Sequence, residues 1–157
     1  MPALDVNPFG PGQPCFGCSQ DHPFGFRLRF SREGDEVVTQ FTPDDRYQGP
    51  PGIMHGGLVT TLADEVAAWA VIGVLEKFGF TAQLTGRLHK PIRIGTPVEG
   101  RAKIAKSTPR LVVSNVRLIQ NGEDAFSGDF SFVLVDQFSA EKLLGGPIPE
   151  AWKKFCR

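Results

Sequence analysis

The sequence predicts an α+β fold, in which one long buried helix packs against a curved antiparallel sheet of about five to six strands. After Gly57, the chain to about Leu75 contains no Pro and one Gly, which predicts a single long helix. Four strand-like segments then follow one another with no helix between them. Strands in direct succession form an antiparallel sheet, and one buried helix against that sheet gives a two-layer domain.

The chain before the helix divides into two parts. Residues 1–25 are rich in Pro and Gly, so no regular helix or central strand can persist there, and we expect an N-terminal arm or lid. The chain has 157 residues, of which 41% are apolar, and this fits one core. We therefore expect residues 26–157 to form a single domain.

Alternating apolar and polar side chains predict the strands. Residues 26–31 alternate in this way, and a turn at Glu33-Gly34-Asp35 leads into residues 36–42, so the two segments form a hairpin. Asn121-Gly122 is typical of a second tight hairpin. A short amphipathic tail, residues 150–155, is expected to pack on the outside. The strands predicted after the helix are residues 81–90, 98–106, 111–120 and 125–135.

Charge and composition exclude several classes of function. Seventeen Lys plus Arg balance seventeen Asp plus Glu without a dense block of either sign, so nucleic acid is not an expected partner. The longest apolar runs fall short of the about 20 residues that span a bilayer, and the first residues lack the features of a signal peptide. We therefore expect no membrane partner. Three cysteines favour a reducing compartment, and the expected location is the cytoplasm.

A Cys pair in the arm has the spacing of metal ligands. Cys15 and Cys18, with His22 nearby, have the look of three ligands of a zinc site, but no fourth ligand is evident. A Pro/Gly-rich arm also differs from the helix start that carries the redox-active pair of thioredoxins. Zinc binding and redox chemistry stay open as alternatives, and we expect reduced structural thiols without a metal.

Asp64 is an unusual residue for its position. The predicted helix is apolar around nearly its whole circumference, which is typical of a helix surrounded by protein. An ionised carboxylate there loses hydration and is tolerated only if it is paired, hydrogen-bonded or functional. Asp64 is therefore a candidate catalytic residue. The alternative is that Asp64 or Glu65 forms a structural salt bridge at a solvated edge or an oligomer interface.

The start of the helix carries the sequence His55-Gly56-Gly57. Two glycines allow another group to approach the backbone, and the free N–H groups at a helix N-terminus favour negative charge, as an oxyanion hole requires. Alternatively, the glycines only ease a tight entry into the helix, and His55 caps or braces the loop. We take all three residues as candidate site residues.

The spacing of these candidates points to two chains. Gly57 and Asp64 are seven residues apart on one helix face, which separates them by about 10 Å. That is too far for both to act on one carbonyl. If both act, Asp64 must come from a second copy of the chain, so we expect a homodimer with two composite sites.

At this point the residues resemble a known family. The run YQGPPGIMHGGLVTTLADE, residues 47–65, is similar to the signature of hotdog-fold acyl-CoA thioesterases of the phenylacetyl-CoA thioesterase (PaaI) type. TAQL at 81–84, KPI at 90–92 and PFGFRL at 23–28 extend the resemblance, which covers residues 15–136.

The resemblance implies a hotdog fold and the hydrolysis of an acyl-CoA thioester. Asp64 would be the general base that activates water, or the nucleophile that forms a mixed anhydride. The N–H of Gly57, with that of Gly56, would polarise the carbonyl, Thr81 would orient the water, and Gln48 would lie near the carbonyl. Coenzyme A would be part of the substrate, no separate cofactor is implied, and the chain would form dimers or dimers of dimers.

Two other functions stay open for this fold. One is a module that binds acyl-CoA without hydrolysis, and the other is a dehydratase or hydratase that uses a catalytic His. A carboxylate at Asp64 favours hydrolysis over simple binding. Glu65 follows directly, and since successive helix residues point about 100° apart, only one of the two faces the site. The motif favours Asp64.

Overall fold

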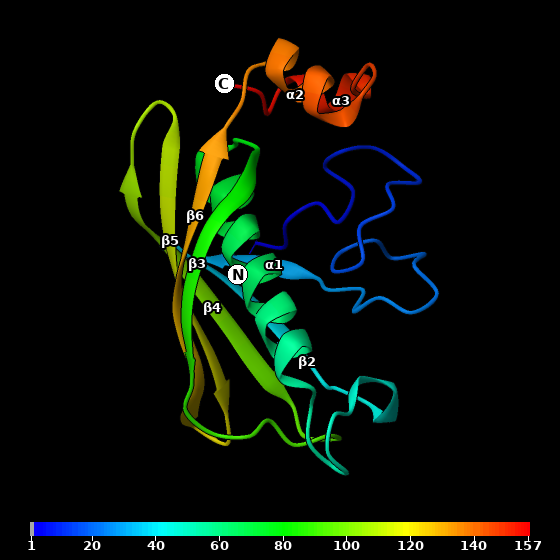
Figure 1. Cartoon of the computed structure of the whole chain (residues 1–157), viewed down its shortest axis with the longest axis vertical. Helices are drawn as coiled ribbons and strands as arrows, with labels where there is room; N and C mark the ends of the chain where they lie inside the picture. The colour runs from blue at the N-terminus through cyan, green and yellow to red at the C-terminus, as the bar shows by residue number, and fades with distance from the viewer. Residues whose placement is uncertain (1) are drawn as a thin grey trace.

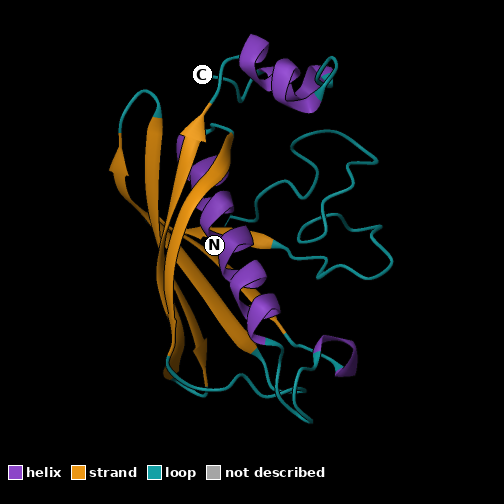
Figure 2. Cartoon of the chain, in the orientation of Figure 1, coloured by secondary structure: helices purple, strands orange, loops and turns teal. Residues whose placement is uncertain are grey.

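The computed structural model describes residues 2–157 and consists of one long helix across one face of a six-stranded antiparallel sheet. Figure 1 shows the helix α1 between the sheet and the loops of the N-terminal arm. Figure 2 shows the helix layer in purple and the sheet layer in orange. The predicted α+β fold class is confirmed. The strands run in the order β1-β2-β4-β5-β6-β3, so β3, which follows the helix in sequence, lies at one edge.

The strand boundaries agree closely with the predicted ranges after the helix. Both predicted hairpin turns are present: Gly34 has φ +64°, and Asn121 and Gly122 have φ 54° and 77°. The strands are β1 (Phe30–Glu33), β2 (Glu36–Phe41), β3 (Gly79–Leu88), β4 (Val98–Ser107), β5 (Leu111–Gln120) and β6 (Glu123–Leu134).

The first strand begins four residues later than predicted. Arg27 has a left-handed backbone with φ 54°, which breaks the extended conformation that alternation at residues 26–31 suggested. The N–H groups of Phe26 and Leu28 instead donate to the carbonyls of Phe16 and Gly17 in the arm. This segment therefore pairs with the arm rather than with the sheet.

Helix α1 spans Gly56–Leu75, as predicted to within one residue at its start. Its side chains against the sheet are fully buried, among them Leu62, Val66 and Ala70. By length and composition α1 would also pass as a membrane span, with a mean hydropathy of 1.7, which corrects the expectation that no apolar stretch reaches that length. Half of that stretch is buried, and its packing against the sheet accounts for the apolar character.

The arm and the C-terminal segment pack together beyond the end of the helix. Phe9 of the arm contacts the rings of Phe78, Trp152 and Phe155, with centroids 4.9–5.7 Å apart. The tail includes the short helix α3 (Glu150–Lys153), and it is preceded by α2 (Gln137–Leu144), which was not predicted. The division of the chain at residue 25 stays a prediction.

The outer edge of the sheet is open along β3. Among residues 2–157 its only strand partner is β6, and every residue from Thr81 to Lys90 is exposed. Two of these are large and apolar: Leu84 is 46% and Leu88 is 53% exposed. An edge of this length with unpaired backbone groups is a template for pairing with another strand.

Candidate active site

The loop that precedes α1 is held by backbone hydrogen bonds at both of its ends. It contains the short 3-10 helix η1 (Asp45–Tyr47), and the N–H of His55 donates to the Tyr47 carbonyl at 2.9 Å. The Met54 N–H donates to the Ile92 carbonyl at 2.8 Å. Gly49 is required by close approach, since a Cβ there would lie 3.2 Å from the His55 Cα. These contacts fix where the helix begins.

At the helix start, the backbone N–H groups of Gly56 and Gly57 differ in whether they already donate a hydrogen bond. His55 is the N-cap residue, and its Nδ1 accepts the N–H of Gly57 at 3.0 Å. The N–H of Gly56 has no acceptor among residues 2–157. It points from the positive end of the helix dipole and is exposed, so it is a free donor for an anionic oxygen.

Asp64 lies where α1 faces the beginning of β3. Its Oδ1 accepts a hydrogen bond from the Thr81 hydroxyl at 2.8 Å, and the side chain is half-buried. Burial raises the pKa of Asp64 above its ordinary value, and the Thr81 hydrogen bond partly opposes this. Asp64 has no ion pair with any Lys, Arg or His in the described part of the chain. A salt-bridge role within one chain therefore does not explain it.

Glu65 contacts a different part of the protein. Its Oε1 accepts the indole N–H of Trp69 at 3.2 Å and the thiol of Cys15 at 3.3 Å, so it faces the arm. Burial is the main cause that raises the pKa of Glu65 to about 8. The two successive carboxylates thus serve separate environments, as the 100° step of a helix requires.

Gln48 is engaged within its own loop. Its Oε1 accepts the N–H of Gly52 at 2.8 Å, and its Nε2 donates to the Asp45 carbonyl at 3.1 Å. The side chain is exposed and lies on the loop that contacts His55. Its amide would have to exchange these bonds before it could contact a substrate.

The predicted site residues form two groups in one chain. Asp64 contacts Thr81 at the beginning of β3, whereas a Cβ on Gly56 would touch Leu88 at the other end of β3, at 3.5 Å. Asp64 with Thr81 and the helix start with Gly56 therefore lie at opposite ends of β3 and do not meet within one copy of the chain.

Two open hollows of about 400 and 430 Å³ lie elsewhere, one beside β1 and one over β3, β5 and β6.

A comparison with protein families matches residues 51–125 to the sequence pattern of the thioesterase superfamily. These residues include the helix start, Asp64 and Thr81. A crystal structure of a thioesterase superfamily protein superimposes with a TM-score of 0.72 at 26% identity, over 85% of this chain and 70% of the other. Both matches are to the thioesterase superfamily, and the sequence match spans just under half of this chain.

Further proteins similar to this chain also carry thioesterase names. Acyl-coenzyme A thioesterase THEM4 of Xenopus laevis is 27% identical over 99 residues, and the match covers 60% of this chain but only 42% of that relative. Zebra fish thioesterase superfamily member 2 shares the fold, with a TM-score of 0.65 at 21% identity over 73% of this chain and 88% of the other. A Streptococcus pneumoniae thioesterase protein, solved with coenzyme A, also shares the fold, with a TM-score of 0.63 at 18% identity. The match covers 68% of this chain and 86% of the other.

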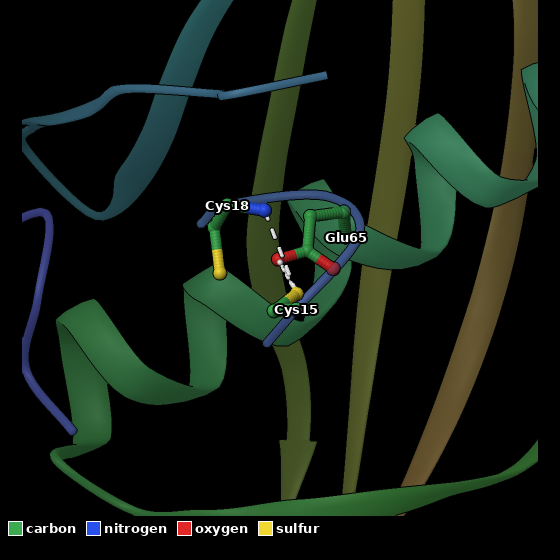
Figure 3. Close-up of side chains that lie close together, drawn as sticks. All are labelled: Cys15, Cys18 and Glu65. Atoms are coloured by element: carbon green, nitrogen blue, oxygen red, sulfur yellow. Dashed lines mark hydrogen bonds between the residues drawn. The ribbon is translucent and has the colours of Figure 1, made fainter. Parts of the chain in front are cut away.

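The sequence predicted only part of one further cluster of side chains. Cys15, Cys18 and Glu65 converge where the arm crosses α1 (Figure 3). His22, the third zinc ligand suggested by the sequence, lies elsewhere: its Nδ1 accepts the Phe24 N–H at 3.1 Å. The CxxC spacing signalled the two thiols, but nothing local in the sequence connects them to a residue 50 positions away.

Proposed function

We propose that this protein hydrolyses acyl-CoA thioesters to the free acid and coenzyme A. The observation that carries the proposal is the half-buried Asp64 carboxylate, hydrogen-bonded to Thr81 at 2.8 Å beside an open sheet edge. A carboxylate is the group that hydrolysis needs and that simple binding of acyl-CoA does not. The family, the curated thioesterase relative and the fold shared with a coenzyme A complex support the same substrate class.

Asp64 and Thr81 would act together on the attacking oxygen. Because the Thr81 hydroxyl donates its hydrogen to Asp64, its oxygen lone pairs remain free to accept a hydrogen bond from water. In one route Asp64 takes a proton from that water as it attacks the carbonyl, the C–S bond breaks, and coenzyme A leaves as the thiol with that proton. In the other, Asp64 attacks the carbonyl itself and expels the coenzyme A thiolate to form a mixed anhydride, which the water then hydrolyses to the free acid. The raised pKa of Asp64 makes its carboxylate a stronger base than an ordinary Asp, as long as the pH lies above that pKa.

The helix start would stabilise the oxyanion. The Gly56 N–H is free and is the first donor in this proposal, and the Gly57 N–H joins it when the His55 ring turns away from its capping position. Gln48 would contribute only after its amide leaves Gly52 and Asp45.

Pairing of two β3 edges would bring the two groups together. If two β3 strands pair antiparallel about a two-fold axis at Thr85, the bulged segment at Thr81 of one chain lies opposite Leu88 of the other. Asp64 contacts Thr81, and Gly56 lies against Leu88, so each Asp64 approaches the partner's helix start. The exposed Leu84 and Leu88 would be covered in the same step.

The remaining parts of the proposal concern partners and location. Coenzyme A is part of the substrate, and no separate cofactor or metal is needed for the hydrolysis. We place the enzyme in the cytoplasm as a dimer or a dimer of dimers. A dehydratase is less well supported, because His55 caps the helix and has no carboxylate ion pair among residues 2–157.

Thiol release tests the activity directly. Purified protein is incubated with a panel of short, long and aromatic acyl-CoAs, and free coenzyme A is followed with a chromogenic thiol reagent. We expect release with at least one acyl group and loss of release in Asp64→Asn. Saturable binding of acyl-CoA without release would instead identify a binding module and contradict the proposal.

A further inference from the structure

Two thiols of the arm and Glu65 of α1 form a second cluster of reactive groups. Their ligand atoms, Cys15 Sγ, Cys18 Sγ and a Glu65 carboxylate oxygen, all lie within 4.8 Å of one another (Figure 3). Cys18 is buried, and Cys15 and Glu65 are half-buried. The proposed hydrolysis uses none of the three.

The chain is shaped to bring these groups together. Cys15 and Cys18 lie on one turn that is closed by the Ser19 N–H donating to the Cys15 carbonyl at 3.1 Å. Gly17, inside this turn, faces Glu65 directly, since a Cβ there would lie 2.4 Å from the Glu65 Cδ. Any side chain at position 17 would therefore displace the carboxylate from the two sulfurs.

Each of the three groups also receives an N–H that orients it. The Cys18 N–H donates to Cys15 Sγ at 3.4 Å, and Gln13 Nε2 donates to Cys18 Sγ at 3.5 Å. The Trp69 indole N–H donates to Glu65 at 3.2 Å. Donors of this kind surround metal ligands in proteins, because they stabilise the anionic ligand and fix its direction while other lone pairs stay free.

The cluster carries no positive charge of its own. Glu65 has no ion pair with any Lys, Arg or His in the part of the chain that the structure describes. Three negative charges this close together would repel one another. A divalent cation would remove that repulsion, since thiolate and carboxylate are the forms that bind metals.

We propose that Cys15, Cys18 and Glu65 bind a thiophilic divalent cation, for which Zn²⁺ is the best match. Two thiolates and one carboxylate select a borderline-soft ion over Mg²⁺ or Ca²⁺, and three protein ligands leave one position of a tetrahedral ion for water. The bound ion fastens the arm to the central helix, because its ligands come from both. Glu65 takes the place of the sequence-predicted ligand His22.

Metal titration of the full chain tests this proposal. The protein is stripped with a chelator under reducing conditions, and Zn²⁺ is then titrated against a chromophoric competitor; Co²⁺ is added separately to record thiolate-to-cobalt absorption. We expect one equivalent of Zn²⁺ and a sulfur charge-transfer band with Co²⁺. The affinity should fall as the pH falls, because protons compete for the ligands.

Variants distinguish the ligand set. Cys15→Ser, Cys18→Ser and Glu65→Gln should each weaken Zn²⁺ binding about 100-fold or more, since changes in the orienting groups alone cost 10- to 100-fold. His22→Ala and Cys156→Ser should bind like the wild type, because both residues lie outside the cluster. Circular dichroism confirms that each variant is folded.

Three results would overturn the proposal: no stoichiometric Zn²⁺ in the folded wild type, wild-type affinity in Glu65→Gln, or loss of binding in His22→Ala. A Cys15–Cys18 disulfide that persists under the reducing conditions would also overturn it. These readouts do not involve turnover, so they stand or fall separately from thioester hydrolysis.

Discussion

Replacement of Asp64 by Asn is the most informative single change. Asn has nearly the shape of Asp, and its amide oxygen still accepts the Thr81 hydrogen bond seen at 2.8 Å. The substitution therefore removes the basic and nucleophilic carboxylate and leaves the contact in place. Loss of a general base lowers the rate by about 10²- to 10⁴-fold, which corresponds to about 3 to 5.5 kcal/mol of transition-state stabilisation.

The same variant should gain stability. The pKa of Asp64 is raised in the folded state, so ionisation of this group opposes folding at any pH above that raised pKa. Asp64→Asn should therefore unfold at a higher temperature than the wild type at neutral pH. The difference should shrink as the pH falls through the raised pKa and vanish below the ordinary pKa of Asp, where the wild-type carboxyl is protonated in both the folded and unfolded states.

The assay compares kcat for coenzyme A release in Asp64→Asn and Glu65→Gln, which make the same chemical change at adjacent positions. We expect the loss at Asp64 to exceed the loss at Glu65 at least tenfold, a factor of about 1.4 kcal/mol. Near-normal turnover in Asp64→Asn together with an inactive Glu65→Gln would refute the assignment. Reduced stability of Asp64→Asn at neutral pH would refute the account of its pKa.

Further predictions concern the neighbouring contacts. Thr81→Val removes the hydrogen bond that lowers the pKa of Asp64, so the acid limb of the pH profile of kcat/KM should move to higher pH. An unchanged acid limb would show that Thr81 does not influence the ionisation of Asp64. Gly25→Ala puts a Cβ 2.1 Å from the Phe16 carbonyl oxygen and should lower the free energy of unfolding, measured by urea denaturation, by about 1–3 kcal/mol. Gly146→Ala is the control, since its Cβ enters open space and should change that free energy little. Leu84→Asp introduces like charges one residue from the proposed pairing axis, so native mass should shift toward monomer and activity should fall. An active monomer would rule out the composite site.

The fold was readable from the sequence where one signal dominated. β5 has the predicted bounds, and Asn121-Gly122 forms its turn to β6, because alternation and turn chemistry act over few residues. The break at Arg27 was not readable, since it depends on hydrogen bonds to the arm. Helix α2 was missed although Asp136 caps it and Gly145 ends it, because its residues lack a clear apolar stripe.

The sequence predicted which residues belong to the candidate site but not how they are arranged in space. The helix start and Asp64 were singled out from the run at residues 47–65, and the structure adds the contact between Asp64 and Thr81. Which amide is free at the helix start could not be foreseen, because it depends on the ring orientation of His55. The approach of Glu65 to the arm thiols depends on tertiary packing across 50 residues.

Subunit complementation tests the central claim most directly. Gly56→Pro deletes one N–H at the first helical position, where Pro is tolerated and His55 already has an extended ψ of 128°; Gly56→Ala keeps the N–H and serves as its control. Asp64→Asn and Gly56→Pro subunits, each inactive alone, are mixed one to one after dissociation. If each site combines Asp64 of one chain with Gly56 of its partner, half of the dimers regain one intact site, and activity returns to about a quarter of the wild type. Mixed dimers that form but stay inactive would show that both groups act within one chain.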